Sequence, residues 1–163
     1  MTAPRAKVWR RMRHRLRRLS QVGLRDHALL AEASVRLLVA KIAIKSVPFA
    51  RIAPSMGELI SPPQAQAKAV ASPASAHDLA VARTIGWAVT RAARHLPFEA
   101  VCLPQAMAAH AMLRKRGIFS IVHFGTARAE SNPLSAHAWV NVEEVEVTGY
   151  PVGPEFTEIA CIA

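Results

Sequence analysis

A change of hydrophobic period at Gly117 constrains the fold of this chain more than any other feature. Before it, apolar residues recur every three or four positions, as they do in helices that pack on a core. After it, apolar and polar side chains alternate in segments rich in β-branched and aromatic residues, which predicts strands over 118–126, 136–142, 144–148 and 156–162. Helices followed by an antiparallel meander predict an α+β domain.

Two of the expected helices come early in the chain. The apolar segment 28–47 carries four charged residues, which favour a helix buried in protein over a transmembrane span: Glu32, Arg36, Lys41 and Lys45. A second helix is expected over 78–95, because Asp78 is a capping residue and a proline follows the helix. Residues 55–77 are rich in Pro, Ser and Ala and predict a long connection, with one helical turn near 65–70.

A third helix is expected directly after Cys102. Pro104 suits the first turn of a helix, where no backbone N–H is needed, and cations followed by Gly117 suit its end. A sulfur at the start of a helix lies beside unpaired N–H groups and the positive end of the helix dipole, which favour the thiolate. Cys161 lacks such a helix and lies near the C-terminus, where fraying is expected. A lone cysteine is often just a small buried hydrophobic residue, so a partner base decides the role of Cys102.

His137 is the candidate base. It opens a predicted strand in the segment SAHAWVNV, with Trp139 two residues on and therefore on the same face. Taken alone, His137 reads as a structural residue and Trp139 as part of the core. Paired with Cys102, however, His137 makes a thiolate–imidazolium couple suited to acyl transfer.

Composition excludes several classes of protein and site. With 163 residues, 52% of them hydrophobic, the chain suits one compact domain and is not disordered as a whole. Two cysteines cannot form a disulfide framework or a four-cysteine zinc site, and they favour a reducing compartment, the cytoplasm. We expect neither a cofactor nor a metal, since the HExxH motif is absent and His95 and His110 have no second ligand at a useful spacing.

Positive charge is concentrated at the N-terminus. Of the net charge of +10, residues 1–27 hold nine Lys or Arg against one Asp, or +8. Apolar residues at spacings of three and four predict a basic amphipathic helix in this arm: Trp9, Met12, Leu16 and Leu19. Such a helix can lie on an anionic membrane, on nucleic acid or on an acidic partner protein, or it can cover part of the domain. We therefore divide the chain into a basic arm, 1–27, and a domain, 28–163.

The segments around Cys102 and His137 resemble a known family. The sequence AARHLPFEAVCLPQAMAAHAMLRKRGI, followed by a strand and then AHAWV, is similar to the transglutaminase-like cysteine peptidases of lasso-peptide biosynthesis, the stand-alone B2-type leader peptidases of the microcin-processing family. The earlier segment LLAEASVRLLVAKIAIKSVPFARIAPSMG resembles their helical lead-in. The resemblance covers about residues 29–147.

This resemblance implies a fold, an activity and partners. The fold would be the papain and transglutaminase core, a Cys-bearing helix packed on a small antiparallel sheet, with a helical lead-in over 28–97 and a catalytic core over 98–163. Cys102 would be the nucleophile and His137 the general base in removing the leader from a ribosomally made precursor. The implied partners are the precursor peptide, a separate leader-recognition protein and an ATP-dependent macrolactam synthetase.

The third catalytic residue departs from the family pattern. That family generally has an Asp about a dozen residues after the His, and this sequence has no Asp after Asp78. If residues 143–144 form a two-residue turn, the register puts Thr148 opposite Trp139 and diagonal to His137. Thr148 is then the candidate that orients the histidine, although a hydroxyl cannot stabilise an imidazolium as a carboxylate would.

Two groups are candidates for stabilising the oxyanion, and two other functions remain open. The candidate donors are the backbone N–H of Cys102 and, one turn on, the side chain of Gln105. One other function is a non-catalytic binding module, attached through the basic arm to nucleic acid or an anionic membrane, with a structural Cys102. The other is a transglutaminase-type amine transferase, which uses the same two residues and differs only in the acceptor.

Overall fold

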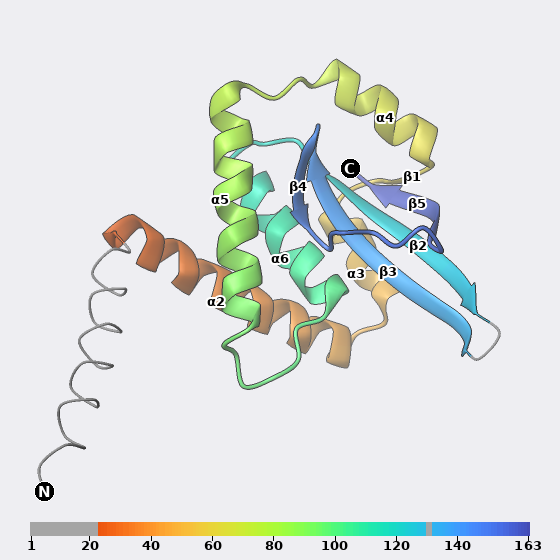
Figure 1. Cartoon of the computed structure of the whole chain (residues 1–163), viewed down its shortest axis with the longest axis horizontal. Coiled ribbons are helices and arrows are strands. Elements are labelled where there is room, and N and C mark those ends of the chain that lie inside the picture. Colours follow the sequence, from red (N-terminus) through yellow and green to blue (C-terminus); the bar gives the residue numbers. More distant parts are fainter. Residues whose placement is uncertain (1–22, 130–131) are drawn as a thin grey trace, which may run out of the picture.

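The computed structural model describes residues 23–129 and 132–163, which form helices packed on one antiparallel sheet (Figure 1). The predicted amphipathic helix of the basic arm lies outside the described residues. The helices are α2 (Leu24–Ser46), α3 (Phe49–Met56), α4 (Pro62–Ala71), α5 (Ala76–Ala93) and α6 (Cys102–Arg114). The strands are β1 (Leu59–Ile60), β2 (Ile121–Ala129), β3 (Asn132–Val142), β4 (Val145–Thr148) and β5 (Thr157–Ile162).

The sheet has the strand order β1-β5-β2-β3-β4, and every neighbouring pair is antiparallel. The four strands expected after Gly117 are all present, and the α+β class is confirmed. Strand β5 comes last in the chain yet lies inside the sheet, between β1 and β2. The sheet is therefore completed by a strand from the helical half, β1, which sequence analysis did not predict.

The long connection expected over 55–77 is wrong, because this segment contains the end of α3, β1 and α4. Ser61 caps α4 in a capping box, and its backbone N–H donates to Gln64 Oε1 at 2.9 Å. The prolines 62 and 63 fall in the first turn, where a missing N–H breaks no helical hydrogen bond. Residues that usually interrupt a helix here begin one.

Helix α6 is the centre of the main core. It packs against α2 and α5 on one side and against β3 on the other (Figure 1). Small side chains allow this close approach on two sides, and Ala106, Ala108 and Ala109 of α6 are all buried. The facing strands contribute a buried apolar row made of Val122, Val140 and Ile162.

The other face of the sheet is only partly covered. A second, smaller cluster of buried apolar residues lies between α4 and this face: Ile60, Ala65, Ile121 and Cys161. Beyond α4, His123 and its cross-strand partner Trp139 lie on this same face as Ile121, because successive side chains of a strand point to opposite faces. A histidine and an aromatic ring thus lie side by side next to the smaller cluster.

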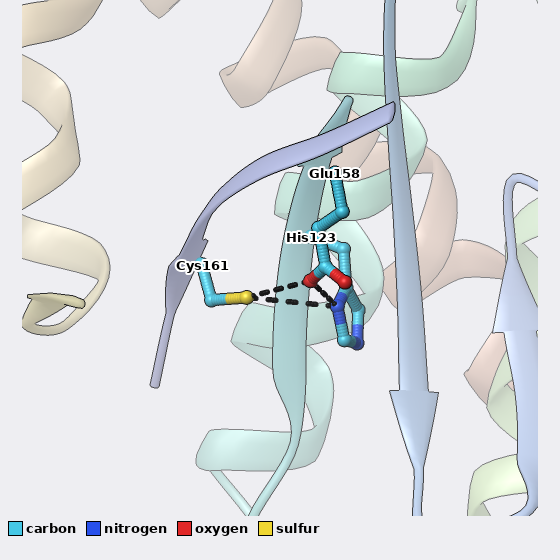
Figure 2. A group of neighbouring side chains, drawn as sticks. All are labelled: His123, Glu158 and Cys161. Atoms are coloured by element: carbon cyan, nitrogen blue, oxygen red, sulfur yellow. Dashed lines mark hydrogen bonds and ion pairs between the residues drawn. The ribbon is translucent and has the colours of Figure 1, made fainter. Parts of the chain in front are cut away.

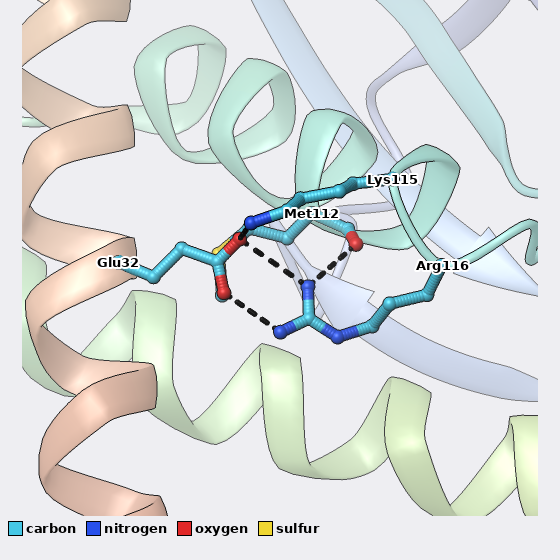
Figure 3. A network of polar contacts seen from close by, with 4 residues as sticks. All are labelled: Glu32, Met112, Lys115 and Arg116. Atoms are coloured by element: carbon cyan, nitrogen blue, oxygen red, sulfur yellow. Dashed lines mark hydrogen bonds and ion pairs between the residues drawn. The ribbon is translucent and has the colours of Figure 1, made fainter.

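An ion-pair network fixes the C-terminal end of α6 to α2 (Figure 3). Arg116 Nη2 and Lys115 Nζ donate to the Glu32 carboxylate at 2.7 and 3.2 Å, and Arg116 Nη1 also donates to the carbonyl of Met112. The hydrogen bond from Arg116 is the main reason why the pKa of Glu32 lies below its usual value. The charge of Glu32 thus holds α2 against the helix that begins with Cys102. None of the helices in the described part of the chain has the length and apolarity needed to cross a membrane.

Candidate active site

Cys102 is the first residue of α6, and its side chain is half-buried. The residue before it, Val101, is the N-cap and has no polar side chain to accept from the first N–H groups of the helix. By contrast, Ser75 caps α5 and accepts a hydrogen bond from the backbone N–H of Asp78. The uncapped N–H groups of α6 are therefore left to interact with negative charge beside Cys102.

His137 lies on β3, and one ring nitrogen is held by the main chain. Its Nε2 atom lies 2.7 Å from the carbonyl oxygen of Gly149. A carbonyl oxygen only accepts hydrogen bonds, so Nε2 must carry a proton. In the neutral ring the lone pair is then on Nδ1, which makes Nδ1 the basic atom.

Cys102 and His137 line the same pocket, which has a volume of about 390 Å³. The pocket lies where the N-terminus of α6 meets the start of β3 and the segment 146–151, and Thr90 of α5 also lines it. The structure records no hydrogen bond between Cys102 Sγ and the His137 ring, so the two share a pocket and not a bond. Catalytic hydrogen bonds of this kind commonly tighten only in the complex with substrate.

Thr148 does not lie where the predicted register places it. Val142 pairs with Val145 across the turn as expected, but Thr148 then pairs with Val140 and not with Trp139. The cause is a register shift between Val140 and the next residue, an extra residue on β4 that two-residue alternation cannot reveal.

This shift also changes the surroundings of the Thr148 hydroxyl. The Oγ1 atom is buried and has no hydrogen-bond partner among the described residues. The hydrogen bond that orients the His137 ring goes to Gly149, the next residue along the chain. The orienting role assigned to Thr148 thus has no contact that supports it.

Gly149 is the residue that sequence reasoning missed. It lies twelve residues after His137, the approximate spacing at which the similar peptidases have their Asp. Its φ is +85°, and a Cβ atom there would lie 2.5 Å from the carbonyl oxygen of Ala138. Glycine is therefore the residue that fits, and it offers its carbonyl to the histidine. The sequence offered one signal for this residue, its spacing of twelve from His137. A backbone carbonyl that accepts a hydrogen bond cannot be recognised from the residue type.

Gln105 lines the pocket, and one N–H of its side-chain amide is already hydrogen-bonded. Its Nε2 donates to the carbonyl oxygen of Ala100 at 2.6 Å, which ties the segment before α6 to the first turn of the helix. A side-chain amide has two N–H donors, so one remains.

Two aromatic side chains lie against the His137 ring. The ring centroid lies 5.8 Å from that of Trp139, in a stacked arrangement, and 5.1 Å from that of Phe156. Trp139 is 8% exposed, so the interpretation of this residue as core is consistent with its burial, while Phe156 was not singled out from the sequence. Nearby, burial raises the pKa of Tyr150 to about 12, so its hydroxyl is a neutral donor at the edge of the pocket.

A second cysteine and histidine lie together elsewhere on the sheet. Cys161, His123 and Glu158 contact one another on the face that α4 partly covers (Figure 2). The expected fraying at Cys161 is wrong, because it belongs to β5 and is 0% exposed. Burial, with the neighbouring Glu158, raises the pKa of the Cys161 thiol, and both effects disfavour a nucleophilic role.

A comparison with protein families gives the chain its relatives. A model of the transglutaminase-like superfamily matches residues 43–161, well over half of the chain, and this range includes Cys102 and His137. That superfamily includes cysteine peptidases and transferases, and its members are usually catalytic. No curated protein and no solved structure is significantly similar to the chain. The extent of the family match shows that the chain belongs to the transglutaminase-like superfamily.

Proposed function

We propose that this protein is a cysteine endopeptidase that removes the leader from a ribosomally synthesised lasso-peptide precursor. One observation carries the proposal: Cys102 at the start of α6 and His137, with its Nε2 tied to Gly149, line one pocket. The superfamily supports thiol chemistry at such a pair. The similarity of the segments around both residues to leader peptidases supports the choice of substrate.

In the first half of the reaction, Nδ1 of His137 takes the thiol proton of Cys102. The sulfur attacks the scissile carbonyl carbon, and a C–S bond forms as the carbonyl oxygen gains negative charge. The backbone N–H of Cys102, left free by the uncapped start of α6, stabilises this oxyanion, with the second N–H of Gln105 as a further donor. His137 then gives its proton to the leaving amine, and the C–N bond breaks.

In the second half, water hydrolyses the thioester that joins the leader to Cys102. His137 takes a proton from the water as it attacks, and the proton returns to the sulfur when the C–S bond breaks. The Gly149 carbonyl holds the ring in the correct tautomer throughout, but it is neutral and stabilises the imidazolium less than a carboxylate would. A modest turnover suits a peptidase that acts once on each precursor.

We propose the partners that the resemblance implies for such a peptidase. They are the precursor peptide, a separate leader-recognition protein that delivers it, and an ATP-dependent macrolactam synthetase that closes the ring. The basic arm, 1–27, is proposed to contact an acidic partner or an anionic membrane, and the cytoplasm stays the predicted location.

The pair itself can be tested without a substrate, by measuring how fast iodoacetamide alkylates Cys102. An ordinary thiol is almost wholly protonated at pH 6, whereas a thiolate paired with an imidazolium still reacts. We expect His137→Ala to react at least about tenfold more slowly at pH 6, with a much smaller difference at pH 9. His95→Ala, which changes an exposed histidine, is the matched control and should react like the unchanged protein. Equal rates in His137→Ala and the unchanged protein at pH 6 would overturn the pairing.

The reaction can be tested with the precursor peptide encoded beside this protein's gene, offered together with its leader-recognition protein. Mass spectrometry should show leader and core fragments that together differ from the precursor by one water. Cys102→Ala and His137→Ala should each abolish the fragments, and the double variant should be hardly worse, because the pair works as a unit. Fragments made by Cys102→Ala would overturn the proposal. A leader mass increased by an added amine, with no free leader acid, would instead indicate amine transfer, and binding without any product would indicate a binding module.

A further inference from the structure

His123, Glu158 and Cys161 form a compact donor set outside the pocket of Cys102 and His137. Figure 2 shows their side chains converging from strands β2 and β5. Nδ1 of His123, a carboxylate oxygen of Glu158 and Sγ of Cys161 all lie within 4.8 Å of one another. Nitrogen, oxygen and sulfur together are the donor set that zinc prefers in proteins.

The register of the sheet brings these three side chains onto one face. His123 and Cys161 are direct cross-strand partners. Glu158 is three residues before Cys161, so in a regular strand it would point to the opposite face. The register shifts by one residue between Phe124 and Gly125, and this irregularity turns Glu158 to the same face as Cys161.

The hydrogen bonds around His123 leave two acceptor atoms facing each other, Nδ1 of His123 and Oε1 of Glu158. Asn141 Nδ2 donates to the carbonyl oxygen of Glu143, so its Oδ1 is the atom that faces His123 Nε2, at 2.7 Å. Because Oδ1 only accepts, Nε2 carries a proton and the lone pair of a neutral ring lies on Nδ1. Yet Nδ1 lies 2.5 Å from Glu158 Oε1, which is another acceptor. Only a proton or a metal ion can join these two atoms.

One of the two distances to the sulfur, from Sγ of Cys161 to Nδ1 of His123, already matches zinc ligation. With Zn–S and Zn–N bonds of about 2.3 and 2.0 Å, tetrahedral zinc holds adjacent sulfur and nitrogen ligands about 3.5 Å apart. Cys161 Sγ and His123 Nδ1 are 3.6 Å apart. Oε1 of Glu158 lies 2.8 Å from Sγ, where it accepts a hydrogen bond from the thiol, and 2.5 Å from Nδ1, so zinc binding would require this oxygen to move outward by about 1 Å. It is the most exposed of the three side chains, at 31%, so it is the one with room to move.

We propose that His123 Nδ1, Glu158 and Cys161 bind one Zn²⁺ ion, with a fourth position open to water. Cys161 binds as the thiolate and releases its proton to solvent. Asn141 does not touch the metal but accepts a hydrogen bond from Nε2 of His123, which fixes the tautomer and aims Nδ1 at the metal. The ion links β5 to β2 and holds the His123 ring flat against Trp139, with centroids 5.4 Å apart and planes 3° from parallel. Trp139 in turn stacks on His137, so the metal braces one wall of the proposed active site.

The test is a cobalt titration of the full chain carrying Cys102→Ser, freed of metal beforehand. Removing Cys102 leaves Cys161 as the only thiol, so a thiolate-to-cobalt charge-transfer band must come from the proposed site. We expect this band to saturate at one equivalent, zinc to displace the cobalt, and zinc to raise the melting temperature of this variant. Absence of the band overturns the proposal, and a protonated His123, seen by NMR with hydrogens on both ring nitrogens, would then identify the bridge as a proton.

Ligand identity is tested in the same Cys102→Ser background. We expect His123→Gln and Glu158→Gln to lose most of the affinity for the metal. Asn141→Ala should bind the metal about 10- to 100-fold more weakly, as is common when the partner that orients a metal-binding histidine is removed. His95→Gln is the matched control, because His95 is exposed, directly follows α5 and is not part of β2 or β5. An unchanged affinity in folded His123→Gln, checked by circular dichroism, would also overturn the proposal.

Discussion

At the scale of single residues, the proposed catalytic pair depends on a glycine. Gly149 presents its carbonyl to His137 because the chain turns there with φ of +85° and passes close to Ala138 and Trp139. A side chain at this position would meet the main chain of β3, and the acceptor would have to move. The group that orients His137 is thus a backbone carbonyl. Its position depends on the lack of a side chain at Gly149, which lets the backbone pass close to β3.

We therefore expect Gly149→Ala to reduce the alkylation rate of Cys102 at pH 6 and to destabilise the fold by more than 2 kcal/mol, since about 1–2 kcal/mol comes from the positive φ alone. Gly117→Ala is the matched control, because Gly117 has a φ of +70° but nothing lies within 4 Å of the added Cβ. Gly117→Ala should lose only the stability that the positive φ costs an alanine, and it should keep the alkylation rate of Cys102. If both variants behave alike, the position of the Gly149 carbonyl does not matter.

A buried histidine makes the fold sensitive to acid. His110 accepts from Ser120 at Nδ1 and donates from Nε2 to the Met56 carbonyl, and burial lowers the pKa of His110 below its usual value of 6.5. Below pH 6.5 the unfolded chain therefore takes up a proton that the folded chain refuses, so the free energy of unfolding falls as the pH falls. Above that pH the ring is neutral in both states, and this contribution is constant.

Urea unfolding at pH 7.5 and at pH 5 should show this loss. We expect the difference between the two pH values to be smaller in His110→Gln than in the unchanged protein, while the variant is less stable at pH 7.5. His95→Gln should leave the difference unchanged, since His95 is exposed. A drop in His110→Gln as large as in the unchanged protein would place the acid sensitivity elsewhere.

At the scale of elements, α5 and β4 meet at backbone distance. A Cβ atom on Gly86 of α5 would lie 2.4 Å from the carbonyl oxygen of Val147. Both elements contribute to the pocket of Cys102 and His137, through Thr90 and the segment that follows Glu146. The spacing between α5 and β4 therefore sets one wall of that pocket.

Gly86→Ala should destabilise the protein, although alanine inside a helix usually stabilises by about 1 kcal/mol relative to glycine. Main-chain atoms cannot move aside as the end of a flexible side chain can, so we expect a lower urea midpoint and slower alkylation of Cys102. Thr84→Ala, at an exposed position of the same helix, should be close to neutral. A stabilised Gly86→Ala would show that α5 and β4 separate easily.

The elements also show what the sequence could predict. Helices α2, α5 and α6 follow from periodicity, and so do Cys102 at a helix start and His137 on a strand. The predicted cap of α5 is wrong, because Ser75 is the N-cap and Asp78 is the third residue of the helix. Helix α3 was missed and α4 was predicted only as one turn near 65–70, because prolines were taken as breakers, whereas here they occupy a first turn or lie within a helix. The shifted registers of β4 and β5 could not be predicted, since an extra residue in a strand leaves no mark on the apolar pattern. Those two shifts place Gly149 and Glu158, the residues that sequence reasoning overlooked.

At the scale of the whole molecule, most of the positive charge lies in a different part of the sequence from Cys102 and His137. The basic arm holds +8 of the net +10, while Cys102 and His137 lie in the nearly neutral remainder. Removing residues 1–19 deletes eight of the nine Lys and Arg of the arm and its apolar stripe. We expect the truncated protein to lose salt-sensitive binding to vesicles containing phosphatidylserine and to keep its alkylation rate. A melting temperature several degrees lower, with vesicle binding unaltered, would show instead that the arm packs on the domain.

The place of β5 in the sheet has a consequence for the order of events during translation. Strands β1 and β2 pair with opposite edges of β5. These two earlier strands therefore lack this hydrogen-bonding partner until residues 157–162 have been made. When α2 to α6 have left the ribosome, these helices can form. Phe156, which contacts His137, and strand β5, which lies between β1 and β2, are still missing at that stage. Phe156, which contacts His137, and the strand that joins β1 to β2 are therefore made only after every residue that lines the pocket of Cys102 and His137.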